Sequence, residues 1–392
     1  MKKEYDPLAS VQAAGPPGTI SFVYGLPDPT TFPSADLARA FQIVLKKGPS
    51  LALQYGPEQG YGPLIDYLRE RIRRVEGRAL ERREIMLTGG ASQALDQLSA
   101  LVGRPGDTVL VEAPTYHEAL RIFRNHGLCP AQVPIDQDGI LVEEIPPLLK
   151  KLERARKRIA FIYLIPSFQN PSGVILSSKR RPALLKLCQA RDLRVIEDDV
   201  YHDLRYEGER APSLFTLDRK GLVLRLGSFS KIMAPGLRLG WITAPPRVIS
   251  LLVGSGLRCM GGGANPLVAN ALSWYCQKGL LEPHVESLIS RYKKRRDLML
   301  RSLKESMPPA VRWAEPSGGF FVWLELPRPL RADDLVIKAK PHGIMFLSGD
   351  DFFAEAPTGQ FLRLAFSYVE PAKIERGIQK LGRLIRQELG QK

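Results

Sequence analysis

A lysine that directly follows a buried strand gives the clearest chemical signal in this 392-residue sequence. The apolar run Val223–Gly227 indicates a strand, and Ser228, Ser230 and Lys231 come immediately after it. Burial penalises the charge of an ammonium group and lowers its pKa from the usual value of about 10.4, so that the neutral amine can attack an aldehyde. We therefore expect Lys231 to bind covalently to the aldehyde of pyridoxal phosphate, and Arg238, seven residues later, to meet the phosphate. An isolated Ser-Lys pair is more often a surface feature, so this assignment depends on the rest of the chain.

A glycine-rich turn supplies a candidate phosphate site. The segment Met86–Asp96 has the pattern of a strand, a Gly-Gly turn and a helix start. The free backbone N–H groups at a helix N-terminus bind anions, so Ala91 and Ser92 would donate to the phosphate. The signal is weak by itself, because Gly-Gly often precedes a helix.

Three acidic residues end the apolar strand that leads into Glu197, Asp198 and Asp199. Carboxylates at a buried strand end need a partner, and a protonated pyridine nitrogen is a suitable one because the ion pair keeps the ring an effective electron sink. We assign that role to Asp198, and expect Tyr201 to reach the ring hydroxyl. A helix cap is the alternative explanation for these acids.

Two further polar residues follow predicted strands. Asn170 stands before a proline, which favours an extended backbone, and its amide could reach the ring oxygen and a substrate carboxylate. Tyr116 lies in the Pro-Thr-Tyr segment after another strand, where it could stack on the pyridine ring or simply pack in the core.

The elements that must position these residues alternate between strand and helix. Seven candidate strands, mostly separated by helices, predict an α/β fold with a mostly parallel sheet flanked by helices, and ligands bind such sheets beyond the carboxyl ends of the strands. A smaller α+β domain is expected to follow. We predict an N-terminal arm over residues 1–44 that belongs partly to this small domain, a large cofactor-binding domain over 45–280 and a C-terminal small domain over 281–392.

Composition narrows the class of protein. The chain is 44% apolar, and no apolar run approaches the roughly 20 residues of a membrane helix. The residues after Met1 lack the apolar segment of a secretory signal, which predicts a cytoplasmic protein. Four widely separated cysteines make a metal or disulfide site improbable. The net charge of +15 is scattered over helix faces, and without a zinc-finger or RNA-binding signature we expect no nucleic-acid partner.

Taken together, these segments resemble fold-type I pyridoxal-phosphate enzymes of aminotransferase class I/II, especially the branch of 2-aminoadipate and kynurenine aminotransferases. The similar segments span nearly the whole chain in the family's order: Gly25–Pro27, Leu53–Tyr61, Gly90–Asp96, Pro114–Tyr116, Phe168–Gly173, Glu197–Tyr201, Ser228–Trp241, Glu315–Phe320 and Phe361–Arg363. Each is weak or moderate alone, apart from the Ser-x-Ser-Lys element with its arginine.

The resemblance implies further roles. Arg363 is similar to the arginine that binds the substrate α-carboxylate, a task suited to a planar bidentate donor, and Gly25 to the backbone group that assists it. Tyr55 resembles a tyrosine that reaches the phosphate of the neighbouring subunit, which implies a homodimer with shared active sites. The loop Gly261–Asn265 lacks the family's usual serine or threonine, which leaves a phosphate contact from that loop in doubt.

The expected substrate preference follows from a second difference between this sequence and the family it resembles. Relatives that act on 2-aminoadipate carry an arginine on an N-terminal helix ahead of the Gly-Leu-Pro segment, whereas this chain has no arginine before Arg39. We therefore expect an aminotransferase that moves the α-amino group of an aromatic or aliphatic amino acid to a 2-oxo acid. A pyridoxal-phosphate lyase, racemase, decarboxylase or acyl-transferring synthase would use the same lysine and aspartate and stays an alternative. A regulatory protein with a disabled enzyme domain is disfavoured by the intact lysine.

Overall fold

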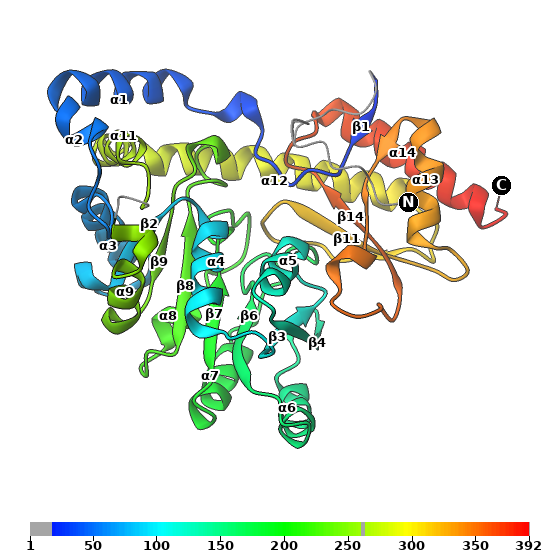
Figure 1. Cartoon of the computed structure of the whole chain (residues 1–392). Coiled ribbons are helices and arrows are strands. Elements are labelled where there is room, and N and C mark those ends of the chain that lie inside the picture. The colour runs from blue at the N-terminus through cyan, green and yellow to red at the C-terminus, as the bar shows by residue number, and fades with distance from the viewer. Residues whose placement is uncertain (1–17, 260–262, 392) are drawn as a thin grey trace.

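The computed structural model describes residues 18–259 and 263–391, and its largest element is an eight-stranded sheet covered by helices (Figure 1). In spatial order its strands are β2 (Ile85–Thr88), β9 (Gly240–Thr243), β8 (Val223–Ser228), β7 (Arg194–Asp198), β6 (Ile159–Leu164), β3 (Thr108–Ala113), β4 (Cys129–Asp136) and β5 (Gly139–Ile140).

All seven predicted strands are present in this sheet. The five from β8 to β4 run parallel, while β9 is antiparallel to both of its neighbours. The eighth strand, β5, pairs antiparallel with the end of β4 and was not predicted. It has only two residues, too few for an alternating pattern to emerge in the sequence.

The helices of the structure agree to within a few residues with the sequence periodicity wherever it predicts a helix, at 36–45, 63–75, 92–102, 116–125, 179–191, 266–277, about 280–307, 331–339 and 371–389. They are α1 (Ser34–Lys47), α2 (Pro49–Leu53), α3 (Gly62–Glu76), α4 (Ala91–Val102), α5 (His117–Asn125), α6 (Ile145–Arg154), α7 (Arg180–Ala190), α8 (Leu214–Leu217), α9 (Pro246–Val253), α10 (Gly256–Cys259), α11 (Pro266–Gln277), α12 (Leu281–Ser306), α13 (Ala332–Ala339) and α14 (Pro371–Glu388).

The two faces of the sheet are buried against different helices because side chains alternate along each strand. On β6, Phe161 and Tyr163 join the apolar cluster formed with α4, α5 and α9. Ile162 and Leu164 of the same strand face the other way, into the cluster that includes α6 and α7. Burial on both faces explains why this strand is almost continuously apolar in the sequence.

A second group of strands lies toward the C-terminal part of the chain (Figure 1). The antiparallel order is β10 (Arg312–Trp313), β11 (Phe321–Leu326), β14 (Gln360–Ala365) and β13 (Leu347–Ser348). The N-terminal β1 (Ile20–Ser21) pairs in parallel with β12 (Ile344–Met345). The N-terminal arm thus contacts the C-terminal region, although the predicted domain boundaries stay a prediction. Within the described residues, no helix is long and apolar enough to span a bilayer.

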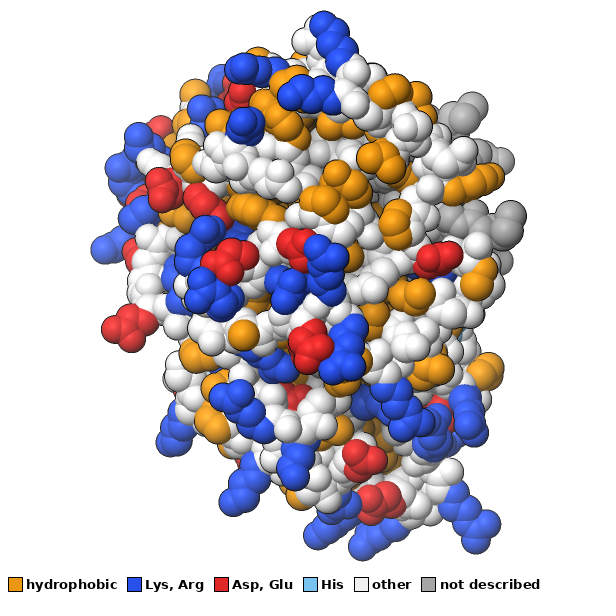
Figure 2. Space-filling view, turned by 90° about the vertical axis from the view of Figure 1, so that its left-hand side faces the viewer, with side chains coloured by type: hydrophobic (Ala, Val, Ile, Leu, Met, Phe, Trp, Pro, Cys, Tyr) orange, Lys and Arg blue, Asp and Glu red, His pale blue; other side chains and the backbone are white. Residues whose placement is uncertain are grey.

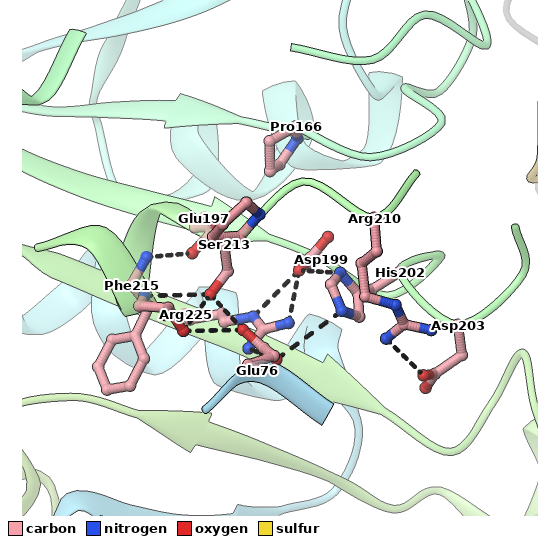
Figure 3. Close-up of polar contacts among 12 residues, drawn as sticks. Glu76, Pro166, Glu197, Asp199, His202, Asp203, Arg210, Ser213, Phe215 and Arg225 are labelled. Carbon is pink, nitrogen blue, oxygen red and sulfur yellow. Dashed lines mark hydrogen bonds and ion pairs between the residues drawn. The ribbon is translucent and has the colours of Figure 1, made fainter. Parts of the chain in front are cut away.

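A buried ionic network joins α3 to β8 and to the segment that follows β7 (Figure 3). Arg225 on β8 lies 2.6 Å from a carboxylate oxygen of Glu76 and 2.6 Å from one of Asp199. His202 lies 3.1 Å from Asp199, and Ser213 donates a hydrogen bond to Glu76. Burial alone would raise the pKa of Glu76, but Arg225, His202 and Ser213 together lower it to about 2.

The low pKa of Glu76 makes the network a source of pH-dependent stability. A carboxyl group whose pKa is lower in the folded than in the unfolded protein stabilises the fold at any pH above its pKa in the unfolded chain, here about 4.5. This stabilisation is lost as the pH falls toward 2. We expect Glu76→Gln to reduce the free energy of unfolding by about 3 kcal/mol at pH 7. The difference in unfolding free energy between wild type and variant should shrink as the pH falls from 5 to 3. Denaturant unfolding at several pH values measures this.

Glu153→Gln is the matched control, because Glu153 pairs with Arg191 on the surface, where ion pairs contribute little. Its unfolding curve should stay close to that of the wild type at each pH. Equal losses for the two variants would contradict a stabilising role of the buried network.

Candidate functional site

A cavity of about 470 Å³ lies beyond the carboxyl ends of the parallel strands. Every residue predicted for the site except Tyr55 lines it: Gly25, Ala91, Ser92, Tyr116, Asn170, Asp198, Tyr201, Ser228, Ser230, Lys231, Arg238 and Arg363. These residues come from both the large sheet and the C-terminal strands, and the fold brings them together around one space.

Lys231 is half-buried in this cavity, in the turn that follows β8. Its Nζ atom donates a hydrogen bond to the carbonyl oxygen of Gly25 at 3.1 Å and lies 5.6 Å from the centre of the Tyr201 ring. Burial lowers the pKa of Lys231 to about 8, and the positive charge of Arg363 adds to this effect, while Asp198 opposes it. The amine is therefore a nucleophile near neutral pH.

Asp198 ends β7 and is buried at the base of the cavity. Its Oδ2 atom accepts a hydrogen bond of 2.8 Å from the hydroxyl of Tyr163, and its Oδ1 atom is buried without a hydrogen-bond partner among the described residues. Burial raises the pKa of Asp198 to about 6. A buried carboxylate oxygen without a partner is costly, so this atom is suited to a donor from a bound ligand.

The neighbouring Asp199 has a different environment. It is fixed by Arg225 and His202 in the ionic network, and it does not line the cavity (Figure 3). These neighbours lower the pKa of Asp199 well below its usual value, although burial alone would raise it. The two adjacent acids thus differ in geometry as well as in ionisation.

The N-terminus of α4 and the side chain of Arg238 form the cationic end of the cavity. Gly90 precedes the helix with a φ angle of 100°, and a Cβ atom built there would lie 2.6 Å from Nη2 of Arg238. Arg238 donates from Nη2 to the carbonyl oxygen of Gly89 at 3.1 Å. The first N–H groups of the helix, those of Ala91 and Ser92, have no acceptor within the helix and can hold an anion.

Arg363 and Asn170 form a second polar group, from segments 193 residues apart. Nη1 of Arg363 donates to Oδ1 of Asn170 at 2.9 Å, and Nη2 donates to the carbonyl oxygen of Val23 at 2.7 Å. The guanidinium carbon lies 4.3 Å from the ring centre of Phe321. Burial lowers the pKa of Arg363 to about 10, so the group stays cationic at neutral pH. Its Nε atom is buried and unpartnered in the described structure, which suits it to a carboxylate ligand.

Two tyrosines and a glycine complete the walls. Tyr116 immediately precedes α5, and burial raises its pKa to about 12. Tyr201 packs edge-on against Phe320 with ring centres 5.5 Å apart. At Gly25 a Cβ atom would lie 2.3 Å from Cζ of Phe321, so no larger residue fits without displacing that ring.

Tyr55 lies outside the cavity, with 74% of its surface exposed. In the loop Gly261–Asn265, Gly261 and Gly262 lie outside the described residues. Asn265, at the end of the loop, caps α11 by accepting a hydrogen bond from the backbone of Val268 at 3.1 Å.

Sequence reasoning missed several residues of the site. Phe321, Leu347 and His117 line the cavity, and Tyr163 contacts Asp198 beneath it. A tyrosine hydroxyl within the apolar strand at 159–164 was an available signal, because a buried hydroxyl needs a partner. Nothing local in the sequence indicated that the partner would be Asp198.

The residues of the cavity fit pyridoxal phosphate. The cationic end at α4 and Arg238 suits a phosphate, the unpartnered Oδ1 of Asp198 suits a protonated ring nitrogen, and Lys231 supplies an amine for the aldehyde. Each match depends on a different part of the cofactor.

Comparison with known proteins identifies the family of the chain. A profile of the family described as "Aminotransferase class I and II" matches residues 28–381. The chain is 39% identical over 375 residues to aromatic-amino-acid aminotransferase 1 of Thermococcus litoralis, an alignment that covers 94% of this chain and 88% of that protein. It is 35% identical to the 2-aminoadipate transaminase of Thermus thermophilus, with 94% and 91% covered.

A solved structure shows the same fold. The kynurenine aminotransferase of Pyrococcus horikoshii, in complex with PMP, has a TM-score of 0.90 and 36% sequence identity, and the match covers 95% of this chain and 92% of that one. With the profile matching most of its length and the cavity matching the cofactor, the chain belongs to the pyridoxal-phosphate-dependent aminotransferases of class I and II.

Proposed function

We propose that this aminotransferase takes its amino group from an aromatic or aliphatic amino acid and passes it to a 2-oxo acid. The observation that carries the proposal is the charge of the cavity wall. Among the described lining residues the cationic side chains are Lys231, Arg238 and Arg363, and each already has a task in the site. No further guanidinium or ammonium group of the described wall is free to pair with a second substrate carboxylate.

The surroundings of Arg363 support an apolar substrate side chain. Phe321 and Phe352 lie 4.3 and 4.9 Å from its guanidinium carbon, and Leu347 pairs with it across the strands. Of these, Phe321 and Leu347 line the cavity, and an aromatic or branched side chain gains free energy by leaving water to contact them. The N-terminal residues in which the family's second arginine would be expected lie outside the described structure through residue 17, and the sequence carries no arginine there.

The proposed mechanism divides the chemistry among four residues. Arg363 binds the α-carboxylate of the amino acid, and Asn170, hydrogen-bonded to it, fixes the angle of the guanidinium. Bound pyridoxal phosphate supplies a ring that withdraws electrons from the α-carbon. Asp198 holds the proton on the ring nitrogen. Lys231 accepts the α-proton at Nζ and later returns it, a role suited to an amine with a pKa of about 8.

We also propose a homodimer whose subunits share their active sites. Leu51, Leu53 and Tyr55 expose 70%, 66% and 74% of their surface, and Leu251 and Leu257 are also largely exposed. These residues belong to α2, to the segment that follows it, and to α9 and α10. In Figure 1, α2 and α9 lie on the left. Figure 2 faces that side and shows hydrophobic side chains among basic ones across its upper half. Exposed apolar groups of this size favour a protein partner. The cytoplasmic location expected from the sequence stays a prediction.

The first test concerns Lys231 as the residue that binds the cofactor covalently. Borohydride reduction of the holoenzyme, followed by peptide mapping, should place the cofactor on Lys231. Lys231→Ala should still bind the cofactor without a covalent bond, but turnover should fall by about 10²–10⁴-fold or more because the proton carrier is gone. Lys220→Ala, at an exposed position, is the control and should keep full activity. Label on another lysine would overturn the assignment.

The donor preference is tested by steady-state kinetics. We expect phenylalanine, tyrosine or leucine to give a higher kcat/KM than 2-aminoadipate, because the described wall offers no second cation. Arg363→Ala should lower kcat/KM for every donor together, by roughly a hundredfold, since all of them share the α-carboxylate. A wild-type preference for 2-aminoadipate would refute the apolar side-chain pocket, and a loss confined to one donor would refute the role of Arg363.

Shared active sites are tested by mixing two damaged subunits. Tyr55→Ala should weaken cofactor binding in the partner subunit, whereas Lys231→Ala disables its own site. A purified heterodimer of the two variants should regain one complete site, with about half of the wild-type activity per dimer. Tyr55→Phe removes only the hydroxyl, so it distinguishes the contribution of the hydroxyl to cofactor binding from that of the ring. A heterodimer no more active than its parents, or a monomeric protein in solution, would contradict the proposal.

A further inference from the structure

The contact between Tyr163 and Asp198 joins two neighbouring strands beneath the cavity. Tyr163 lies on β6, is fully buried, and its hydroxyl donates to Oδ2 of Asp198 at 2.8 Å. Its ring packs edge-on against Phe123 of α5, with ring centres 5.2 Å apart. The hydroxyl is therefore held by a rigid core position and cannot follow Asp198 if the carboxylate turns.

This contact makes the two oxygens of Asp198 unequal. Oδ2 has its donor in Tyr163, while Oδ1 is buried and unpartnered among the described residues. The Tyr163 bond therefore favours the orientation of the carboxylate in which one oxygen is held by the phenol. Oδ1 is therefore the oxygen that remains available to a ligand in the cavity.

The direction of the hydrogen bond is fixed as well. Burial raises the pKa of Tyr163 well above its usual value, with a further contribution from Asp198, so the phenol stays protonated and acts as the donor. A donor to the ionised carboxylate opposes the effect of burial, which raises the pKa of Asp198. Asp199 cannot replace Tyr163 as the donor to Asp198. It is an ionised carboxylate, which only accepts hydrogen bonds, and it is already paired with Arg225 and His202.

We propose that Tyr163 is a positioning residue for the cofactor: its hydroxyl holds Asp198 so that one ionised oxygen faces the ring nitrogen. This rests on the proposed role of Asp198. Tyr163 does not touch the substrate and is not among the residues that line the cavity. Its influence is therefore expected to act only through the ring nitrogen, and not through the phosphate or the aldehyde.

The experiment compares two ligands on the apoenzyme: pyridoxal phosphate and its analogue in which a C–H group replaces the ring nitrogen. The ratio of their dissociation constants, from absorbance or fluorescence titration, isolates the contribution of the ring nitrogen. Wild-type protein should prefer pyridoxal phosphate. In Tyr163→Phe this preference should fall by about tenfold or more, the usual effect of removing a hydrogen bond to a charged group.

Tyr206→Phe is the matched control. Tyr206 is also buried, and its hydroxyl donates a hydrogen bond to the carbonyl oxygen of Gly319, which the substitution removes. Tyr206 does not contact Asp198. It should leave the ratio unchanged even if it lowers the melting temperature as much as Tyr163→Phe does. Because Tyr163→Phe keeps the ring that packs against Phe123, we expect it to fold, and thermal unfolding verifies this.

The outcomes distinguish a failure of the role of Tyr163 from a failure of the role of Asp198. If wild type prefers pyridoxal phosphate and Tyr163→Phe retains the full preference, the role of Tyr163 is overturned while that of Asp198 stands. If Tyr163→Phe weakens both ligands equally, the hydroxyl is merely structural and the proposal is overturned as well. If wild type binds both ligands equally, or Asp198→Asn leaves the preference intact, the proposed role of Asp198 fails and the inference fails with it.

Discussion

The parallel pairing of β6, β7 and β8 is the constraint on which the site depends. Parallel neighbours end at the same edge of a sheet, so the polar segments that follow them converge without any contact being specified in the local sequence. Asn170 follows β6, Asp198 ends β7, and Lys231 follows β8. The α4 N-terminus joins them because β2 is paired with β9, which in turn is paired with β8.

Burial then gives these residues their chemical properties. Burial lowers the pKa of Lys231 to about 8, raises that of Asp198 to about 6 and lowers that of Arg363 to about 10, because it disfavours the charged form of each group. Arg363 also contributes to the low pKa of Lys231. In the proposed complex, a carboxylate bound to Arg363 would offset that contribution, so occupation of the substrate site and the basicity of the amine are linked.

The local pattern of the sequence was sufficient for the large elements. The sequence pattern predicts helices at 92–102 and about 280–307 and a strand at 159–164, and α4, α12 and β6 lie close to these bounds because each pattern extends over enough residues. Strands of two residues, β5, β12 and β13, were missed. They are stabilised by their partners in the sheet rather than by their own composition.

The residue types that could hold a phosphate, a ring nitrogen and an aldehyde were determined by the sequence itself, since each type and its place after a strand can be recognised locally. Tertiary structure supplied the physical difference between the two adjacent acids: Asp198 lines the cavity, while Asp199 is held by Arg225. It also decided the pairing of Tyr163 with Asp198, 35 residues apart, and of Arg363 with Asn170, 193 residues apart. Such contacts depend on strand order and on the face to which each side chain points, and no local periodicity contains that information.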